Sequence, residues 1–154
     1  MDATIARESV CNNSALRRAA RRMAQWYDEA MAPVGLRGTQ YTILLQIDRA
    51  GGEPLVGKLA EALVMDLSAL GHTLRALQRE GLVEVVVDAA DRRSRRARLT
   101  HSGKARLAKA RVQWARAQRR FEAAFGVEDA ARLRGVLDFI ASPDFDERLR
   151  GQAD

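Results

Sequence analysis

The length, composition and charge of the chain exclude several classes of protein. At 154 residues, with 47% hydrophobic and 30% charged residues, it is long enough for one domain with a core, too short for two ordinary domains, and not composed like a disordered protein. Its net charge of +6 favours a polyanionic partner. The single cysteine allows no disulfide within the chain, and no segment predicts a signal peptide or a membrane helix, so we expect a cytoplasmic protein without a membrane partner.

The first two predicted helices are amphipathic. Apolar side chains recur three and four residues apart over about residues 14–32, and Pro33 and Gly35 end that helix. A second helix follows, for which Thr39 is the expected N-cap and Gly51 the stop. Arg17, Arg18, Arg21 and Arg22 stand on the first helix without a neighbouring acid, which predicts a basic face or a solvated helix surface.

Residues 55–81 predict a helix-turn-helix. A short helix over residues 55–63 is followed by a tight turn and a helix that opens at Asp66, whose carboxylate we expect to bond the amide of Ser68 or Ala69. Leucines at positions 67, 70, 74 and 77 share one face, which we expect to be buried. The candidate DNA contacts on this helix are Ser68, Ala69, His72, Thr73, Arg75 and Arg79.

Two β-prone runs then flank a strongly cationic loop. Residues 92–98 contain five arginines, and residues 92–121 contain twelve Lys/Arg and no acid. Like charges at that density repel one another unless they are solvated or face a polyanion. The order helix, glycine, strand, cationic loop, strand is that of a winged helix-turn-helix. Arg92, Arg93 and Arg95 are the candidate groove contacts, whereas strand alternation puts Arg96 and Arg98 on one face, where we expect them to contact phosphate.

The C-terminal third predicts two more helices. A long helix capped by Ser102 runs to about Phe125, with apolar residues spaced for packing along another helix. A last helix covers about residues 129–141 and ends at Pro143. The expected fold is therefore mainly α with a small antiparallel β wing, a single domain over residues 1–154. Its winged helix-turn-helix lobe is expected at about 36–100, and helices at about 14–32 and 102–141 are expected to bury their apolar faces in a symmetric dimer.

No enzymatic or metal chemistry is expected. Residues 52–58 have the spacing of a phosphate-binding loop, but Leu59 stands where Ser or Thr would hold Mg²⁺. His72, His101 and Cys11 are too few and too scattered for a four-ligand metal site. We therefore expect no cofactor and no metal.

The chain resembles the multiple-antibiotic-resistance regulator (MarR) family of bacterial transcription factors from about residue 16 to 140. GLRGTQYTILLQI is similar to the family's second helix, and DLSALGHTLRALQREGLVE to its recognition helix and exit strand. DAADRRSRRARLTHSGKA is similar to its wing, with the Asp-x-Arg signature followed by Leu-Thr-x-x-Gly. The resemblance implies a homodimer that binds double-stranded DNA at a pseudo-palindromic operator and represses nearby genes.

The resemblance also implies roles for single residues. Asp91 and Arg93 would form an ion pair that buttresses the wing, while Arg92 or Arg95 enters the minor groove. A small aromatic or phenolic effector would bind in a cleft lined by Arg18, Arg22, Trp26, Tyr27 and Tyr41.

Alternative functions remain open at this point. One branch of the family senses hydroperoxides through a cysteine, and Cys11 lies in about the right region, although Ala15 stands where that branch has tyrosine. A nonspecific architectural DNA-binding protein and a protein-interaction module are the other hypotheses. Selection of bound sequences from random duplex DNA would separate them.

Overall fold

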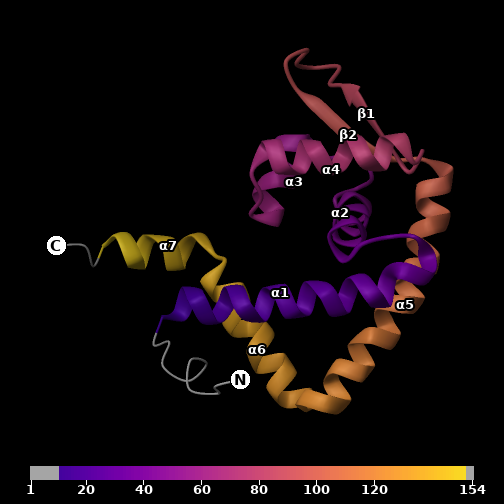
Figure 1. Ribbon diagram of the computed structural model, residues 1–154. Helices are drawn as coiled ribbons and strands as arrows, with labels where there is room; N and C mark the ends of the chain where they lie inside the picture. The colour runs from indigo at the N-terminus through magenta and orange to yellow at the C-terminus, as the bar shows by residue number, and fades with distance from the viewer. Residues whose placement is uncertain (1–10, 152–154) are drawn as a thin grey trace.

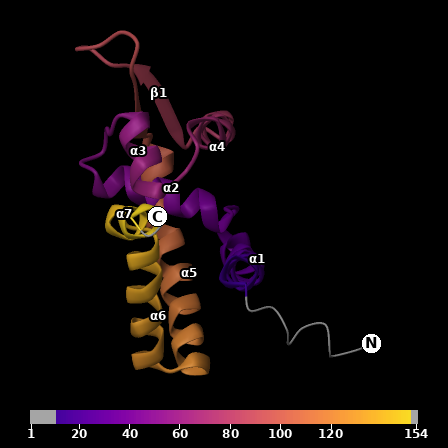
Figure 2. The same cartoon turned by 90° about the vertical axis from the view of Figure 1, so that its left-hand side faces the viewer.

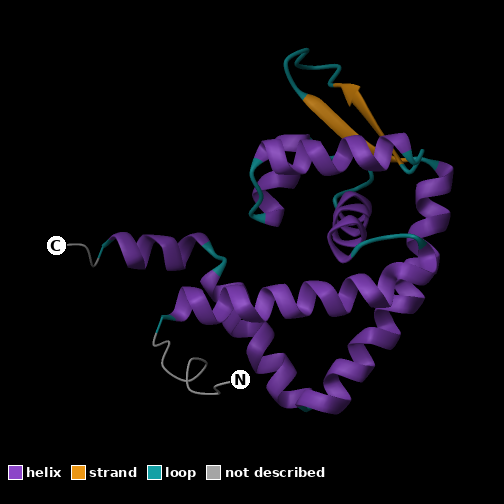
Figure 3. Cartoon of the chain, in the orientation of Figure 1, coloured by secondary structure: helices purple, strands orange, loops and turns teal. Residues whose placement is uncertain are grey.

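The computed structural model describes residues 11–151, which form helices and one two-stranded antiparallel sheet (Figures 1 and 3). The prediction of a mainly α fold with a small β wing is thus confirmed. In chain order the elements are α1 (Asn12–Met31), the 3-10 turn η2 (Ala32–Val34), α2 (Gly38–Arg49), α3 (Val56–Leu63), α4 (Leu67–Arg79), β1 (Val83–Val87), β2 (Arg95–Leu99), α5 (His101–Phe125), α6 (Val127–Ile140) and α7 (Pro143–Arg150).

The core lies where α2, α3 and α4 meet the sheet and the start of α5. Ile43, Leu44 and Ile47 of α2 are fully buried there, and Leu70 and Leu77 of α4 pack in the same cluster. Leu74 is also buried, as expected. The prediction for Leu67 is wrong: it is the first residue of α4, stands at the open end of the turn and is 60% exposed.

The wing is a regular hairpin fixed to the lobe at its base. Val83 pairs with Leu99 and Val87 with Arg95 in an antiparallel register. Val83, Ala97 and Leu99 are buried, so one face of the hairpin packs on the core. The amide of Ala97 donates to the carbonyl of Pro54 at 3.1 Å, which ties β2 to the loop between α2 and α3. Figure 1 shows the hairpin projecting over α4, at the end of the molecule opposite the α5–α6 turn.

Three of the predicted helix caps need correction. Thr100, not Ser102, caps α5: its hydroxyl accepts from the amide of Gly103 at 2.9 Å and donates to the carbonyl of Gly81 at 2.6 Å. Helix α2 begins at Gly38, one residue before Thr39, because the carboxylate of Asp28 on α1 already receives the Gly38 amide at 2.7 Å. Asp66 holds the N-cap position of α4, but its side chain makes no capping hydrogen bond.

The C-terminal helices depart from the expected ending. Pro143 starts a further helix, α7, because proline lacks the amide that the first helical turn leaves unbonded anyway. Ser142 caps this helix by accepting from the Phe145 amide at 3.3 Å. Helices α5 and α6 meet at Gly126 and diverge from that turn as a V (Figure 1), and Figure 2 views this V from the side, with the two helices close together in projection. Across residues 11–151, no helix is both long and apolar enough to cross a membrane.

Candidate functional site

Helix α4 and the wing present the predicted DNA contacts on the outside of the lobe. Ser68, Ala69, His72, Arg75 and Arg79 are exposed, because burial of the leucine face turns the rest of α4 outward. Thr73 is half-buried, and its hydroxyl donates to the carbonyl of Ala69 at 3.2 Å, within its own helix. Of this set, Thr73 is the least available to a partner.

A hollow of about 490 Å³ lies between α3, α4 and the wing. Arg75 from α4 and Arg93 and Arg95 from the wing line it together, so side chains 18 to 20 positions apart in sequence meet there. Lys58 and Gln78, which the sequence pattern does not single out, line it as well. The other predicted contacts lie outside this α4–wing hollow, and all of them but Thr73 are exposed. The sequence signal for Gln78 is its position one turn after Arg75.

The predicted ion pair between Asp91 and Arg93 is not formed. The Asp91 carboxylate accepts instead from the backbone amide of Arg93 at 2.9 Å and from the Ser94 hydroxyl at 2.8 Å. In an exposed turn, the short side chain of an aspartate reaches the backbone amide two residues further on more easily than it reaches the guanidinium of that residue. Asp91 therefore shapes the loop, and the Arg93 side chain is left without a hydrogen bond or ion pair to residues 11–151.

The ion pair that anchors the wing joins Arg96 to Asp88. Arg96 Nε donates to Asp88 Oδ1 at 2.6 Å, and Arg96 Nη1 donates to the carbonyl of Glu53 at 2.8 Å. The hydrogen bond from Arg96 holds the pKa of the buried Asp88 carboxyl below its ordinary value. Arg98 donates to Glu84 at 2.7 Å across the strand pair, and that bond raises the pKa of Arg98. Arg96 and Arg98 do share a face, as predicted, but both guanidiniums are paired with carboxylates of the protein and are therefore not free to contact phosphate.

Arg95 and Arg92 differ in whether the guanidinium is held by hydrogen bonds. Arg95 Nη1 donates to the carbonyls of Arg92 at 3.0 Å and Ser94 at 3.2 Å, so its guanidinium lies over the loop backbone. The side chain of Arg92 is exposed and has no such partner among residues 11–151. Arg92 and Arg93 are thus the two loop cations without a partner among residues 11–151, whereas Arg95 is held over the loop backbone but keeps an exposed charge with no acid beside it.

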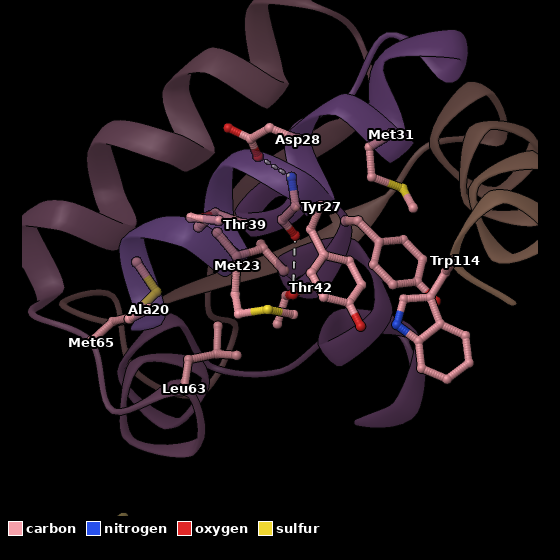
Figure 4. Close-up of a pocket in the computed structure, with 14 residues that line it drawn as sticks. Ala20, Met23, Tyr27, Asp28, Met31, Thr39, Thr42, Leu63, Met65 and Trp114 are labelled. Carbon is pink, nitrogen blue, oxygen red and sulfur yellow. Dashed lines mark hydrogen bonds between the residues drawn. The ribbon is translucent and has the colours of Figure 1, made fainter. Parts of the chain in front are cut away.

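A second cavity, of about 450 Å³, lies between α1, α2 and α5 (Figure 4). Tyr27 and Tyr41 line it, as expected for the effector cleft, but Arg18, Arg22 and Trp26 do not. Both arginines are exposed on the outer side of α1, and the Trp26 ring packs edge-on against Tyr27 and under the guanidinium of Arg120. These three residues therefore do not line this cavity, because helical position alone does not tell which flank of the apolar stripe of α1 faces α2.

The tyrosines of this cavity are held by packing. Tyr41 stacks on Trp114 with ring centroids 6.5 Å apart, and the Tyr27 hydroxyl donates to Gln118 Oε1 at 3.1 Å. Burial raises the pKa of both Tyr27 and Tyr41, so both hydroxyls stay protonated at neutral pH. They can serve a ligand as hydrogen-bonding groups but not as charges.

Sequence reasoning missed most of the lining of this cavity. Met23, Met31 and Met65 contribute thioethers, and among residues 11–151 Asp28 contributes the only charged group of the lining. The spacing of Met23, Tyr27 and Met31 by four residues would have placed them on one face of α1, but nothing in the sequence indicates that α2 and the turn after α3 close over that face.

Cys11 lies outside both hollows. It is exposed at the N-cap position of α1, and its thiol makes no capping hydrogen bond. Its redox role stays a prediction.

Comparison with known proteins agrees with this geometry. The model of the MarR family matches residues 34–94, which span the lobe from the end of η2 to the wing loop. No curated protein matches the chain. Among solved structures, the transcriptional regulator MOSR of M. tuberculosis in complex with DNA is similar, with 33% sequence identity, a TM-score of 0.79, and coverage of 91% of this chain and 98% of that one.

Two further structures are similar over most of their length. The transcriptional repressor CouR, bound to a 23-mer DNA duplex, has 30% identity and a TM-score of 0.77, with 87% of this chain and 94% of that chain covered. The organohalide-sensing regulator RdhR in its 2,4-dichlorophenol-bound form has 16% identity and a TM-score of 0.73, with coverage of 82% and 75%. The chain has a winged helix lobe with a cationic wing, and it is 33% identical to MOSR and 30% identical to CouR over most of its length. It belongs to the MarR family of DNA-binding transcriptional regulators.

Proposed function

We propose that the protein is a homodimeric repressor that binds a pseudo-palindromic operator and responds to a small aromatic ligand. The observation that carries the DNA-binding part is the α4–wing hollow, in which Arg75, Arg93 and Arg95 converge from two elements. Three guanidiniums that share one hollow repel one another, and a phosphate backbone would relieve that repulsion. MOSR and CouR, two relatives solved with DNA, support the same role.

The exposed residues divide by chemistry into base-reading and backbone-positioning groups. Ser68, Ala69 and His72 are small or polar, lie in the first half of α4 and would approach base edges in the major groove. Arg75, Arg79, Arg93 and Arg95 would contact phosphate, and Arg92 would enter the minor groove beside the recognition helix.

The apolar surface of α6 supports the homodimer. Over residues 127–140 Ala130 is the one buried residue, whereas Val136, Leu137 and Phe139 are between 39% and 54% exposed. An exposed apolar stripe of this kind, next to the long α5, is typical of an interface. A second copy of the chain that covers it would place two α4 helices symmetrically, and twofold symmetry of the protein implies twofold symmetry of the operator.

The cavity between α1, α2 and α5 supports a ligand response. It joins the helix that leads into the dimer region, α1, to a core helix of the DNA-binding lobe, α2. A ligand there could change the angle between the two and with it the spacing of the two recognition helices. RdhR, a relative in fold, was solved with 2,4-dichlorophenol bound, a small aromatic ligand of suitable size for such a cavity.

Selection of bound sequences from random duplex DNA tests the proposal. We expect an enriched pseudo-palindrome whose half-sites lie about one helical turn, roughly 34–36 Å, apart. Enrichment of a site without dyad symmetry would contradict the dimeric interpretation. Salt-dependent binding with no enriched sequence would indicate an architectural DNA-binding protein instead.

A further inference from the structure

The cavity between α1, α2 and α5 has an unusual charge character for its place in so basic a protein. No Lys, Arg or His among residues 11–151 lines it, and its single charged group there is the carboxylate of Asp28. The cations that influence its two tyrosines lie outside the lining: Arg111 near Tyr41 is paired with Asp48 at 2.6 Å, and Arg134 near Tyr27 is paired with Glu122 at 3.5 Å. Arg49, which also influences Tyr41, lies outside the lining as well. A ligand carboxylate would therefore find no counter-ion in the cavity.

Asp28 also occupies the position that a ligand acid would otherwise use. The first turn of a helix has backbone amides that no carbonyl of the helix accepts, and it is the positive end of the helix dipole, so the N-terminus of α2 attracts an anion. Asp28 Oδ1 already accepts the Gly38 amide at 2.7 Å (Figure 4). A second carboxylate at this end of the cavity would meet a fixed negative charge.

The other oxygen of Asp28 is available to a hydrogen-bond donor. Asp28 Oδ2 accepts no hydrogen bond from residues 11–151, although its side chain is half-buried against the cavity. A hydroxyl group on a ligand could donate to it, and a charge-assisted hydrogen bond of this kind is stronger than one between neutral groups.

The rest of the wall suits an aromatic body. Tyr41 and Trp114 form a stacked pair on one side, and Met23, Met31 and Met65 present thioethers on the others. Aromatic faces bind aromatic rings by offset stacking, and methionines adapt to ligands of different outline. In Figure 4 the Tyr27 and Trp114 side chains and the Met23 thioether lie around the same space.

We propose that this cavity binds an uncharged aromatic compound with a hydroxyl group and discriminates against aromatic acids. Asp28 is the residue that makes the distinction: it accepts the ligand's hydroxyl and repels a carboxylate. The proposal deepens the ligand response proposed above and rests on it only for its regulatory consequence, because the binding preference is a property of the cavity itself.

Isothermal titration calorimetry of the full chain without DNA tests the preference, with 2-naphthol and 2-naphthoate at pH 7 as probes. The two probes share one ring system, but 2-naphthol carries an uncharged hydroxyl group where 2-naphthoate carries a carboxylate. We expect 2-naphthol to bind at least about tenfold more tightly, because a like charge near a partly buried carboxylate is strongly unfavourable. Equal or tighter binding of 2-naphthoate, or no binding of either probe at millimolar concentration, would overturn the proposal.

The variant Asp28→Asn assigns the preference to this residue. Asparagine keeps an oxygen for the Gly38 amide and removes the charge, so 2-naphthoate should gain affinity and the preference should fall to about threefold or less. The matched control is Glu29→Gln, an exposed neighbour on α1 outside the cavity, which should keep the wild-type preference. An unchanged preference in Asp28→Asn would refute the role of Asp28.

The proposed function is tested separately by fluorescence anisotropy of labelled duplex DNA with the same protein sample. A protein that prefers 2-naphthol but binds no DNA would contradict the proposed function and leave the cavity chemistry standing. A protein that binds DNA but prefers 2-naphthoate would contradict the proposed cavity chemistry and leave the proposed DNA-binding function standing.

Discussion

Arg96 and Asp88 form an ion pair at the point where the two strands of the wing enter the loop over residues 88–94. Arg96 Nε lies 2.6 Å from Asp88 Oδ1, and the same guanidinium donates to the Glu53 carbonyl at 2.8 Å. The amide of Asp88 also donates to the Ser94 carbonyl at 3.0 Å, which closes the loop above the pair. The loop that carries Arg92 and Arg93 therefore stands on a fixed base, and its position over α4 depends on this ion pair.

Asp88→Asn should weaken operator binding several-fold, although the change removes a negative charge from the proposed DNA-binding surface. The weaker pair would let the wing move relative to α4, whereas charge alone predicts tighter binding. Fluorescence anisotropy with the selected operator measures the affinity, and Asp144→Asn at the start of α7 is the control. Tighter binding by Asp88→Asn would mean that the pair does not position the wing.

Arg92→Ala should weaken operator binding by about 1–3 kcal/mol, the usual value of a good groove contact. Its guanidinium has no partner among residues 11–151, so the fold should be unaffected. Affinities measured over a range of salt concentrations show how the arginine acts. If Arg92 neutralises one phosphate, the slope of log K against log salt should be smaller by about 1 in the variant. An unchanged affinity would exclude Arg92 from the interface.

Asp91→Ala separates loop shape from charge. Its carboxylate holds the Arg93 amide and the Ser94 hydroxyl, so the variant should bind more weakly with an unchanged salt slope. Tighter binding at moderate salt would show that the loop acts only as a cationic patch.

Val136→Arg should convert the protein from dimer to monomer. Val136 lies on α6, is 54% exposed and belongs to the apolar stripe proposed to face a second copy. A charge buried in an interface without a partner is strongly unfavourable. Sedimentation velocity measures the outcome, with Val87→Arg on the wing, 53% exposed, as the matched control. A wild-type monomer at low micromolar concentration, or an unaffected dimer in the variant, would refute this interface.

The helix-turn-helix and wing could be predicted from sequence because each has a local signal. The leucine period of α4, the glycine after it and the two β-prone runs all depend on neighbours within a few residues. Leu67 shows the limit of that signal, since the same period continues to the helix end, where no neighbouring element covers it.

The partners of the arginines could not be predicted in the same way. The sequence alone does not distinguish the five arginines of the wing from one another. The pairing of Arg96 with Asp88 depends on the strand register and on the position of Glu53, which only the fold determines. Most of the lining of the cavity between α1, α2 and α5 could not be predicted for a similar reason, because it comes from α1, α2, the turn after α3 and α5, which meet only in the folded chain.

Gly103→Ala should destabilise the protein by about 1–3 kcal/mol, the usual range for overpacking a rigid site. A Cβ at Gly103 would collide with the carbonyl oxygen of Leu82 and lie 3.0 Å from its carbonyl carbon. That carbonyl cannot turn away freely, because it accepts the amide of Thr100 at 3.1 Å, and Thr100 in turn caps α5. The glycine of the Leu-Thr-x-x-Gly pattern is thus required by the close approach of α5 to the residue that precedes β1.

The matched control is Gly57→Ala on α3, where an added Cβ would meet no atom within 4 Å. The free energy of unfolding of Gly57→Ala should lie within about 0.5 kcal/mol of the wild-type value, with any rise due to the better helix propensity of alanine. Urea unfolding of both variants provides the comparison. If Gly103→Ala is as stable as Gly57→Ala, the packing of α5 against Leu82 is looser than the structure has it, and the glycine has another reason to be there.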